Sequence, residues 1–136
     1  MKKYKTKALT IILRSDNILE AFNNKDWNEP ETLEIAKENA FMLKKVIDGQ
    51  SVGLLVEIPH KYVTKEILTY YQNFEMGAVA RAMFLNSFAA KVVGNLYFKL
   101  SKGKLNEVGR AVPTKLFTKK AEAVEWLLEQ IEKSRK

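Results

Sequence analysis

Few residues of this sequence could carry out chemistry, and they are scattered. His60 is the single histidine, there is no cysteine, and the three aspartates fall in predicted loops or turns. A nucleophile or a metal site needs several such groups close together. His60 follows the end of a predicted strand, where α/β sheets often bind ligands, but an exposed loop histidine is the simpler interpretation. The sequence therefore predicts no catalytic residues, no metal site and no cofactor.

Two charged residues interrupt predicted strands that are otherwise apolar. Glu57 lies in residues 52–58, and Arg81 lies in residues 78–84. If these strands are neighbours, the two side chains could pair across the sheet; alternatively, each simply lies near a strand end. Ion pairs with a purely structural role shift the pKa values of buried charged groups, as catalytic sites also do. We therefore interpret this pair as structural.

The start of the last predicted helix is a candidate anion site. Thr118 is the expected cap, and Lys119 and Lys120 follow it in the first turn. Lysines at this end oppose the helix dipole, at about 0.3–1 kcal/mol each. Either solvent screens them, or an anion bound at the helix start compensates them.

Basic residues are concentrated in one part of the chain. The net charge is +7, and residues 77–121 hold nine lysines and arginines but one acid. Such an excess either attracts an anionic partner or is a set of solvated lysines. An anionic or lipid-like small ligand, or a membrane surface, is therefore an alternative partner. Nucleic acid is not expected, because it would require exposed stacking aromatics and a steep salt dependence.

The central element that positions these residues is the stretch 77–100, GAVARAMFLNSFAAKVVGNLYFKL. Residues 78–84 form a short apolar run that predicts a buried strand. Asn86 and Ser87 are good N-caps, and a helical spacing follows them. The predicted inward face of that helix comprises Ala89, Ala90, Val93, Leu96, Tyr97 and Leu100.

The opposite face of this helix is a candidate interaction face. Its polar stripe is interrupted by apolar side chains, each of which loses about 1.5–3 kcal/mol if left in water. We expect the loop 101–112, a second copy of the chain in a homodimer, or a separate protein partner to cover them. The face comprises Phe88, Lys91, Val92, Asn95, Phe98 and Lys99.

The remaining elements predict a single α/β domain over residues 1–136, since the length suits one domain. A hairpin joins residues 5–13 and 18–22, and a helix begins with a capping Asn28 and ends at Gly49. A strand at 52–58, a helix from Thr64 to about Phe74, a strand at 113–117 and a final helix complete the order. Alternating strands and helices indicate mainly parallel strands, with about four helices around a mixed sheet.

Several phrases resemble the small bacterial proteins with the SpoIIAA-like (STAS-like) fold, in a poorly characterised branch. These are LRSDNILEAF, ETLEIAKENAFMLKKVIDG, GAVARAMFLNSFAAKVVGNLYF and PTKLFTKKAEAVEWL, which together span nearly the whole chain. The resemblance implies the SpoIIAA-like fold. It also implies a possible phosphorylation switch, for which Thr64 is the candidate residue. The Asp-Ser-Ser/Thr-Gly-like motif of the family is missing around Thr64, so we expect Thr64 to act mainly as a helix cap.

The resemblance and the missing catalytic groups together predict a non-enzymatic regulatory or protein-interaction module of STAS-like type. The alternative is a protein that binds an anionic or lipid-like small ligand through residues 77–121. We expect a cytoplasmic protein, because the apolar run 8–13 is too short for a signal sequence. No stretch approaches the ~20 apolar residues of a membrane span.

Overall fold

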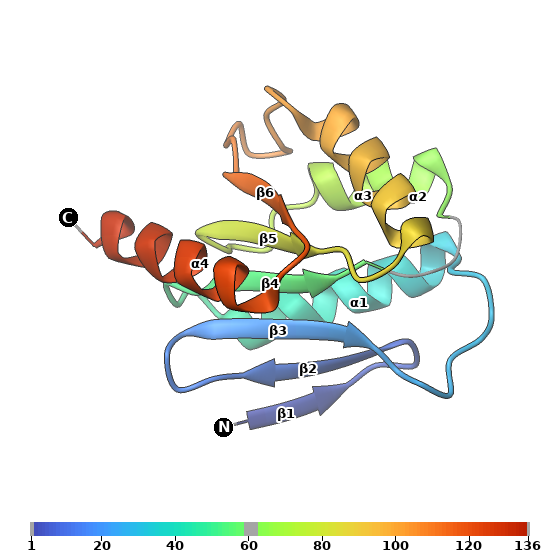
Figure 1. The fold of residues 1–136 in the computed structure, drawn as a ribbon, viewed down its shortest axis with the longest axis horizontal. Helices are drawn as coiled ribbons and strands as arrows, with labels where there is room; N and C mark the ends of the chain where they lie inside the picture. The colour runs from blue at the N-terminus through green and yellow to red at the C-terminus, as the bar shows by residue number, and fades with distance from the viewer. Residues whose placement is uncertain (1, 59–62, 136) are drawn as a thin grey trace.

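The computed structural model describes residues 2–58 and 63–135, and it shows an α/β fold with a mixed sheet (Figure 1). Strands β1 to β6 lie side by side in the order of the chain. The first three are antiparallel, and β3 to β6 run parallel. The elements are β1 (Lys2–Lys5), β2 (Leu9–Leu13), β3 (Ile18–Asn23), α1 (Leu33–Ile47), β4 (Gly53–Glu57), α2 (Lys65–Asn73), β5 (Ala80–Phe84), α3 (Phe88–Ser101), β6 (Thr114–Phe117) and α4 (Lys120–Ser134). The predicted hairpin, element alternation and mixed sheet are confirmed.

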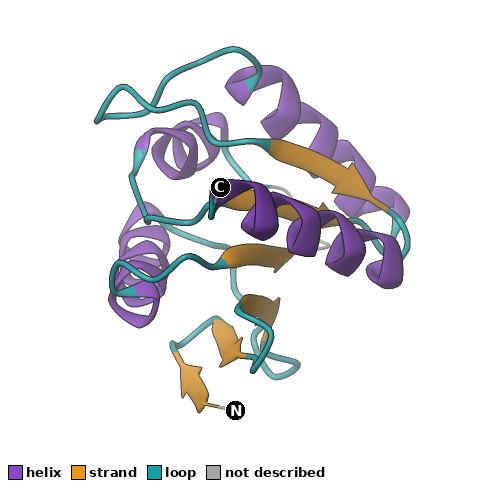
Figure 2. Cartoon of the chain, turned by 90° about the vertical axis from the view of Figure 1, so that its left-hand side faces the viewer, coloured by secondary structure: helices purple, strands orange, loops and turns teal. Residues whose placement is uncertain are grey.

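Helices cover the sheet unequally on its two faces (Figures 1 and 2). Helix α1 connects β3 to β4, α2 connects β4 to β5, and α3 connects β5 to β6. Each connection therefore moves one strand further along the sheet, always toward β6. Right-handed crossovers therefore place all three helices on one face. Helix α4 packs alone on the other face, where Leu127 contacts a cluster that includes Leu55 and Ala82. Alternate strand residues point to opposite faces, so Leu54 and Met83 belong to the clusters under α1–α3.

The buried strand predicted within residues 78–84 is confirmed as β5, which lies between β4 and β6. The predicted first strand, residues 5–13, is instead divided into β1 and β2. A tight turn separates them, in which the Thr6 N–H donates to the Leu9 carbonyl at 2.9 Å. The turn of the predicted hairpin is confirmed, and Asn17 adopts the left-handed conformation with φ 67°.

Two predicted helix starts are confirmed and two are wrong. The hydroxyls of Thr64 and Ser87 accept the N–H of the third helical residue, as caps should. Helix α1 begins after Thr32, whose hydroxyl caps it, and not at Asn28. Helix α4 has Lys119 at its N-cap position and no side-chain cap, so Thr118 is not the cap that was expected.

No helix among the described residues is long and apolar enough to cross a membrane.

Candidate functional site

The inner face of α3 packs closely on β5. Its buried residues are Ala90, Val93, Gly94 and Tyr97. A Cβ at Gly94 would lie 2.5 Å from Cδ2 of Leu85, just after β5, so a side chain there would require Leu85 to shift. These buried residues define the inner face of α3, and the residues on the opposite side of the helix face outward.

The outer face of α3 carries an exposed apolar stripe, formed by Phe88, Val92 and Leu96. Their exposed fractions are 82%, 57% and 37%. The three residues are four apart, so they lie above one another on one side of the helix. The prediction that Ala89 and Leu96 face inward was wrong, since both are exposed. Phe98, predicted to lie at the border of the face, is half-buried.

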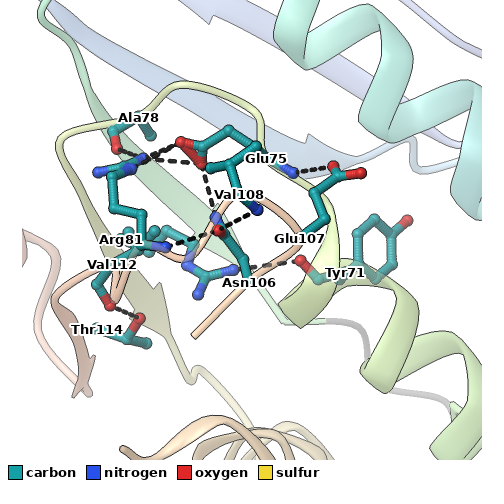
Figure 3. Close-up of polar contacts among 10 residues, drawn as sticks. Tyr71, Glu75, Ala78, Arg81, Asn106, Glu107, Val108, Val112 and Thr114 are labelled. Carbon is teal, nitrogen blue, oxygen red and sulfur yellow. Dashed lines mark hydrogen bonds and ion pairs between the residues drawn. The ribbon is translucent and has the colours of Figure 1, made fainter. Parts of the chain in front are cut away.

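The loop 101–112 does not cover this stripe. It is held instead against the segment that joins α2 to β5 (Figure 3). Glu75 there pairs with the Arg110 guanidinium at 2.7 Å and accepts from the Asn106 amide at 2.8 Å. The Glu75 N–H donates to the Glu107 carboxylate at 2.7 Å. Of the three expected covers, the loop is therefore excluded, because Phe88 stays exposed, and the stripe is open to a partner.

Positive charge borders the stripe. Lys91, Asn95 and Lys99 are exposed, and α3 contains no acidic residue. The Asn95 amide donates to the Lys91 carbonyl at 2.7 Å within the helix. We call Phe88, Val92 and Leu96 with these three polar residues the α3 outer face. All residues of the predicted interaction face except Phe98 are therefore exposed on one side of α3. Leu96, which was predicted to face inward, lies on the same side.

Arg81 on β5 points under the helices and does not pair with Glu57. Strand register explains why, since Arg81 lies beside Leu54, whereas Glu57 lies beside Phe84 and therefore on the other face. Glu57 accepts hydrogen bonds from the backbone N–H of Asn23, at 3.2 Å, and from the Asn86 amide, at 3.4 Å. The predicted structural pair is therefore wrong.

The Arg81 side chain is 9% exposed and contacts two tyrosines. One terminal nitrogen, Nη1, donates to the Tyr97 hydroxyl. The same nitrogen donates to the Tyr71 carbonyl at 3.4 Å (Figure 3). The guanidinium also lies 5.4 Å from the centre of the Tyr97 ring, a cation–π contact. Burial raises the pKa of Tyr97, and the nearby Arg81 charge opposes this rise. Arg81 Nε has no hydrogen-bond partner among the described residues.

A second buried polar chain links the first turn to α1 and α2. The Thr6 hydroxyl donates to the Asn39 side chain at 2.6 Å, and the Asn39 amide donates to the Tyr71 hydroxyl at 3.3 Å. That hydroxyl donates to the Glu31 carboxylate at 2.5 Å. Burial raises the pKa of Glu31, and the Tyr71 hydrogen bond partly offsets this. Burial, and then the Glu31 charge, raise the pKa of Tyr71 well above its ordinary value.

Two hollows meet at the edge where the parallel strands end. The outer one is an open cleft of about 700 Å³ beside β1, β2 and the ends of β3 and β4. The inner one is a cavity of about 100 Å³ between the sheet and the α1–α3 layer, mostly apolar, with Arg81 and Tyr97 in its wall. The residues that line both hollows are Asn23, Glu31, Glu57 and Val63. Neither hollow could be predicted from the sequence, because the walls of each come from many separate segments.

The other candidate residues do not converge. Lys120 Nζ lies 2.6 Å from Glu20 Oε1 on β3, so this lysine is neutralised within the fold. Thr118 and Lys119 are exposed beside it. Thr64 is exposed, and its hydroxyl is engaged as a cap at 3.3 Å from the Ile67 nitrogen. His60 lies outside the described residues.

Within residues 2–58 and 63–135, no group of three or more histidine, cysteine, aspartate or glutamate side chains is placed to hold a metal ion. The model of one protein family, described as "Domain of unknown function (DUF7793)", matches residues 12–131. No curated protein matches the chain, and no solved structure does.

Proposed function

The chain belongs to the DUF7793 family, and we propose that it works as a non-enzymatic protein-interaction module of STAS-like type, with the α3 outer face as its docking surface. The observation that carries the proposal is the open stripe of Phe88, Val92 and Leu96 on a helix whose other side is firmly packed. Large apolar side chains in a row along a rigid helix are typical of protein-binding surfaces.

The partner is a different protein, with an apolar segment bordered by carboxylates. Charge supports this choice, since Lys91 and Lys99 border the stripe and α3 has no acid. A two-fold contact between two copies of α3 would bring like charges together, which is unfavourable. A membrane surface suits the stripe less well, because three residues span only about 12 Å of helix. The homodimer expected from the sequence is the competing alternative to this proposal. The cytoplasmic location stays a prediction.

Site-specific photocrosslinking in the producing organism tests this proposal. A benzophenone amino acid replaces Val92, and the matched control replaces Leu128, an exposed leucine on α4. We expect one discrete protein adduct from position 92, absent from position 128 and lost when Lys91→Glu and Lys99→Glu are added. Equal adducts at both positions, an adduct of the chain with itself, or no adduct would overturn the proposal.

A sedimentation experiment with lipid vesicles distinguishes binding to a membrane surface from binding to a protein partner. Liposomes with about a third phosphatidylserine should leave the wild-type protein in the supernatant after sedimentation. Pelleting that disappears in Phe88→Asp with Val92→Asp would show that the α3 outer face binds lipid, and would contradict a protein partner.

A further inference from the structure

Strand β6 lies at one edge of the sheet and pairs with β5 on one side only (Figure 2). Arg81 on β5 lies beside Thr114, but its N–H donates to the carbonyl of Pro113, at 2.8 Å. In a parallel ladder, the residues of a strand alternate between bonding to the neighbouring strand and pointing their backbone groups away from it. The N–H and C=O groups of Thr114 and Leu116 therefore point away from β5, out of the sheet.

These four backbone groups are not used by the fold. Within residues 2–58 and 63–135, no hydrogen bond from another segment reaches the N–H or C=O of Thr114 or Leu116. The Thr114 hydroxyl turns back to the Val112 carbonyl, at 3.0 Å, and leaves the edge open. A row of unpaired donors and acceptors along an edge strand is a template for one more strand.

The two edges of the sheet differ in what surrounds them. Helices α3 and α4 both contact β6, and they lie on opposite faces of the sheet. Three of the four residues of β6 are partly buried, whereas three of the four residues of β1, at the other edge, are exposed. A strand added to β6 would therefore extend the sheet beside two helices, which would bury its side chains better than β1 could.

An apolar shelf borders β6 on the α4 side. The rings of Phe117 and Trp126 lie 5.7 Å apart, and both are half-buried. Lys115 lies two residues before Phe117 and therefore on the same face of β6, and its Nζ is 5.5 Å from the centre of the Phe117 ring. This face fits a strand that carries apolar side chains two residues away from acidic ones.

The charge around this edge also favours an acidic occupant. Lys115 and Lys119 are exposed, and neither forms an ion pair with another described residue. Lysines on an edge strand commonly protect it from pairing with another copy of the same chain. Two copies of this chain, each with a net charge of +7, would also repel each other.

We propose that the free edge of β6 binds an extended, acidic segment of a partner protein as an added strand. The N–H groups of Thr114 and Leu116 donate to carbonyls of the segment, and their C=O groups accept from its N–H groups. Main-chain hydrogen bonds supply affinity in this kind of recognition, and alternate side chains supply specificity. The edge is separate from the α3 outer face, so the proposal does not depend on docking there.

Amide hydrogen exchange of the full chain, followed by NMR, tests the proposal with the acetylated and amidated heptapeptide ETVEVTE. We expect saturable binding with a millimolar or tighter Kd, and at least tenfold slower exchange of the Thr114 and Leu116 amides at saturation. The amides of Lys115 and Phe117 already face β5 and should change little. No slowing at Thr114 and Leu116 with up to 5 mM peptide, or equal slowing at all four amides, would overturn the proposal.

Two control peptides separate strand pairing from charge attraction. The peptide KTVKVTK keeps the backbone and reverses the charge, whereas ETVEVTE with methylated backbone nitrogens keeps the charge and loses the donors. Both should bind at least tenfold more weakly than ETVEVTE. Equal binding of KTVKVTK would contradict an acidic occupant, and equal binding of the methylated peptide would contradict an added strand.

Variants locate the site on β6. Thr114→Pro removes an outward N–H that the β5 ladder does not use, and Thr114→Val keeps this N–H as the matched control. We expect at least tenfold weaker peptide binding in Thr114→Pro and no change in Thr114→Val. Equal affinities of the two variants would contradict the proposal.

Two further variants keep the test decisive if Thr114→Pro does not fold. Lys115→Glu, at an exposed position, should weaken binding of ETVEVTE at least threefold, and unchanged binding would contradict the proposed charge contact. Phe88→Asp with Val92→Asp should bind the peptide as wild type does. Loss of peptide binding in this double variant would place the peptide on the α3 outer face and overturn the proposal for β6.

Discussion

Arg81 on β5 donates a hydrogen bond to the hydroxyl of Tyr97 on α3, and the two residues lie sixteen apart in the sequence. This contact, together with the close approach at Gly94, holds one side of α3 against the sheet. Phe88 and Val92 must then point away from the core. The same pair of residues therefore supports the docking surface.

The hydroxyl of Tyr97 should contribute measurably to stability. Tyr97→Phe removes an acceptor from the buried Arg81 guanidinium, and leaving such a donor unsatisfied costs about 1–3 kcal/mol. Urea denaturation gives this free energy of unfolding. The matched control is Tyr70→Phe, whose ring stacks on Phe74 and which should change stability by no more than about 0.5 kcal/mol. Equal losses in the two variants would show that the Arg81 contact is not stabilising.

Glu31 should make the fold less stable as the pH rises. Burial raises its pKa above the ordinary 4.5, so the folded chain holds this proton more tightly than the unfolded chain. The stabilisation is complete below pH 4.5 and is lost as the pH rises through the folded pKa. Relative to Glu31→Gln, the wild-type free energy of unfolding should therefore fall across that range. Denaturation curves at several pH values measure the difference, and a flat difference would exclude this role.

Glu75 should show the opposite dependence. Burial opposes ionisation there, but hydrogen bonds and charge from Arg110, with Asn106 and Arg81, lower its pKa below 4.5. The stabilisation is complete above pH 4.5 and is lost as the pH falls through the folded pKa. In the same denaturation series, wild type should lose stability relative to Glu75→Gln on acidification. A difference with the same sign of slope as that for Glu31 would contradict the assignment of both groups.

Two threonines provide a direct comparison of capping. The Thr64 hydroxyl caps α2, whereas Thr118 makes no cap to α4. Thr64→Ala should cost about 1 kcal/mol, and Thr118→Ala should stay within about 0.5 kcal/mol of wild type. Thermal unfolding of both variants would measure the two losses. The assignment fails if Thr118→Ala is the more damaging substitution.

Much of the fold could be predicted from local patterns. The apolar run around β5, the caps Thr64 and Ser87, and the turn at Asn17 each depend on residues close together in the sequence. The start of α1 was misplaced because Asn28, Pro30 and Glu31 resemble a helix start, while Thr32 alone makes the cap. Glu31 is instead drawn toward Tyr71, forty residues away, which no local pattern shows.

The candidate site could be predicted only in part. The alternation along α3 identified Phe88 and Val92 as outward-facing, but periodicity placed Ala89 and Leu96 on the wrong side. The close approach of Gly94 to Leu85 is a tertiary contact, which periodicity does not show. Similarly, the charges of Arg81 and Glu57 predict a pair, but the strand register places the two side chains on opposite faces of the sheet. The orientation of these side chains thus depends on contacts between distant segments, which sequence spacing does not show.

Docking through the α3 outer face is tested most directly by an affinity measurement with the protein crosslinked at position 92. The purified partner is titrated against wild type, against Phe88→Asp with Val92→Asp, and against Leu128→Asp as an exposed control on α4. Because a few buried apolar anchors carry most of the binding energy of an interface, we predict at least a tenfold weaker Kd for the double variant and no change for the control. Equal affinities of wild type and the double variant, with both folded, would contradict docking through α3.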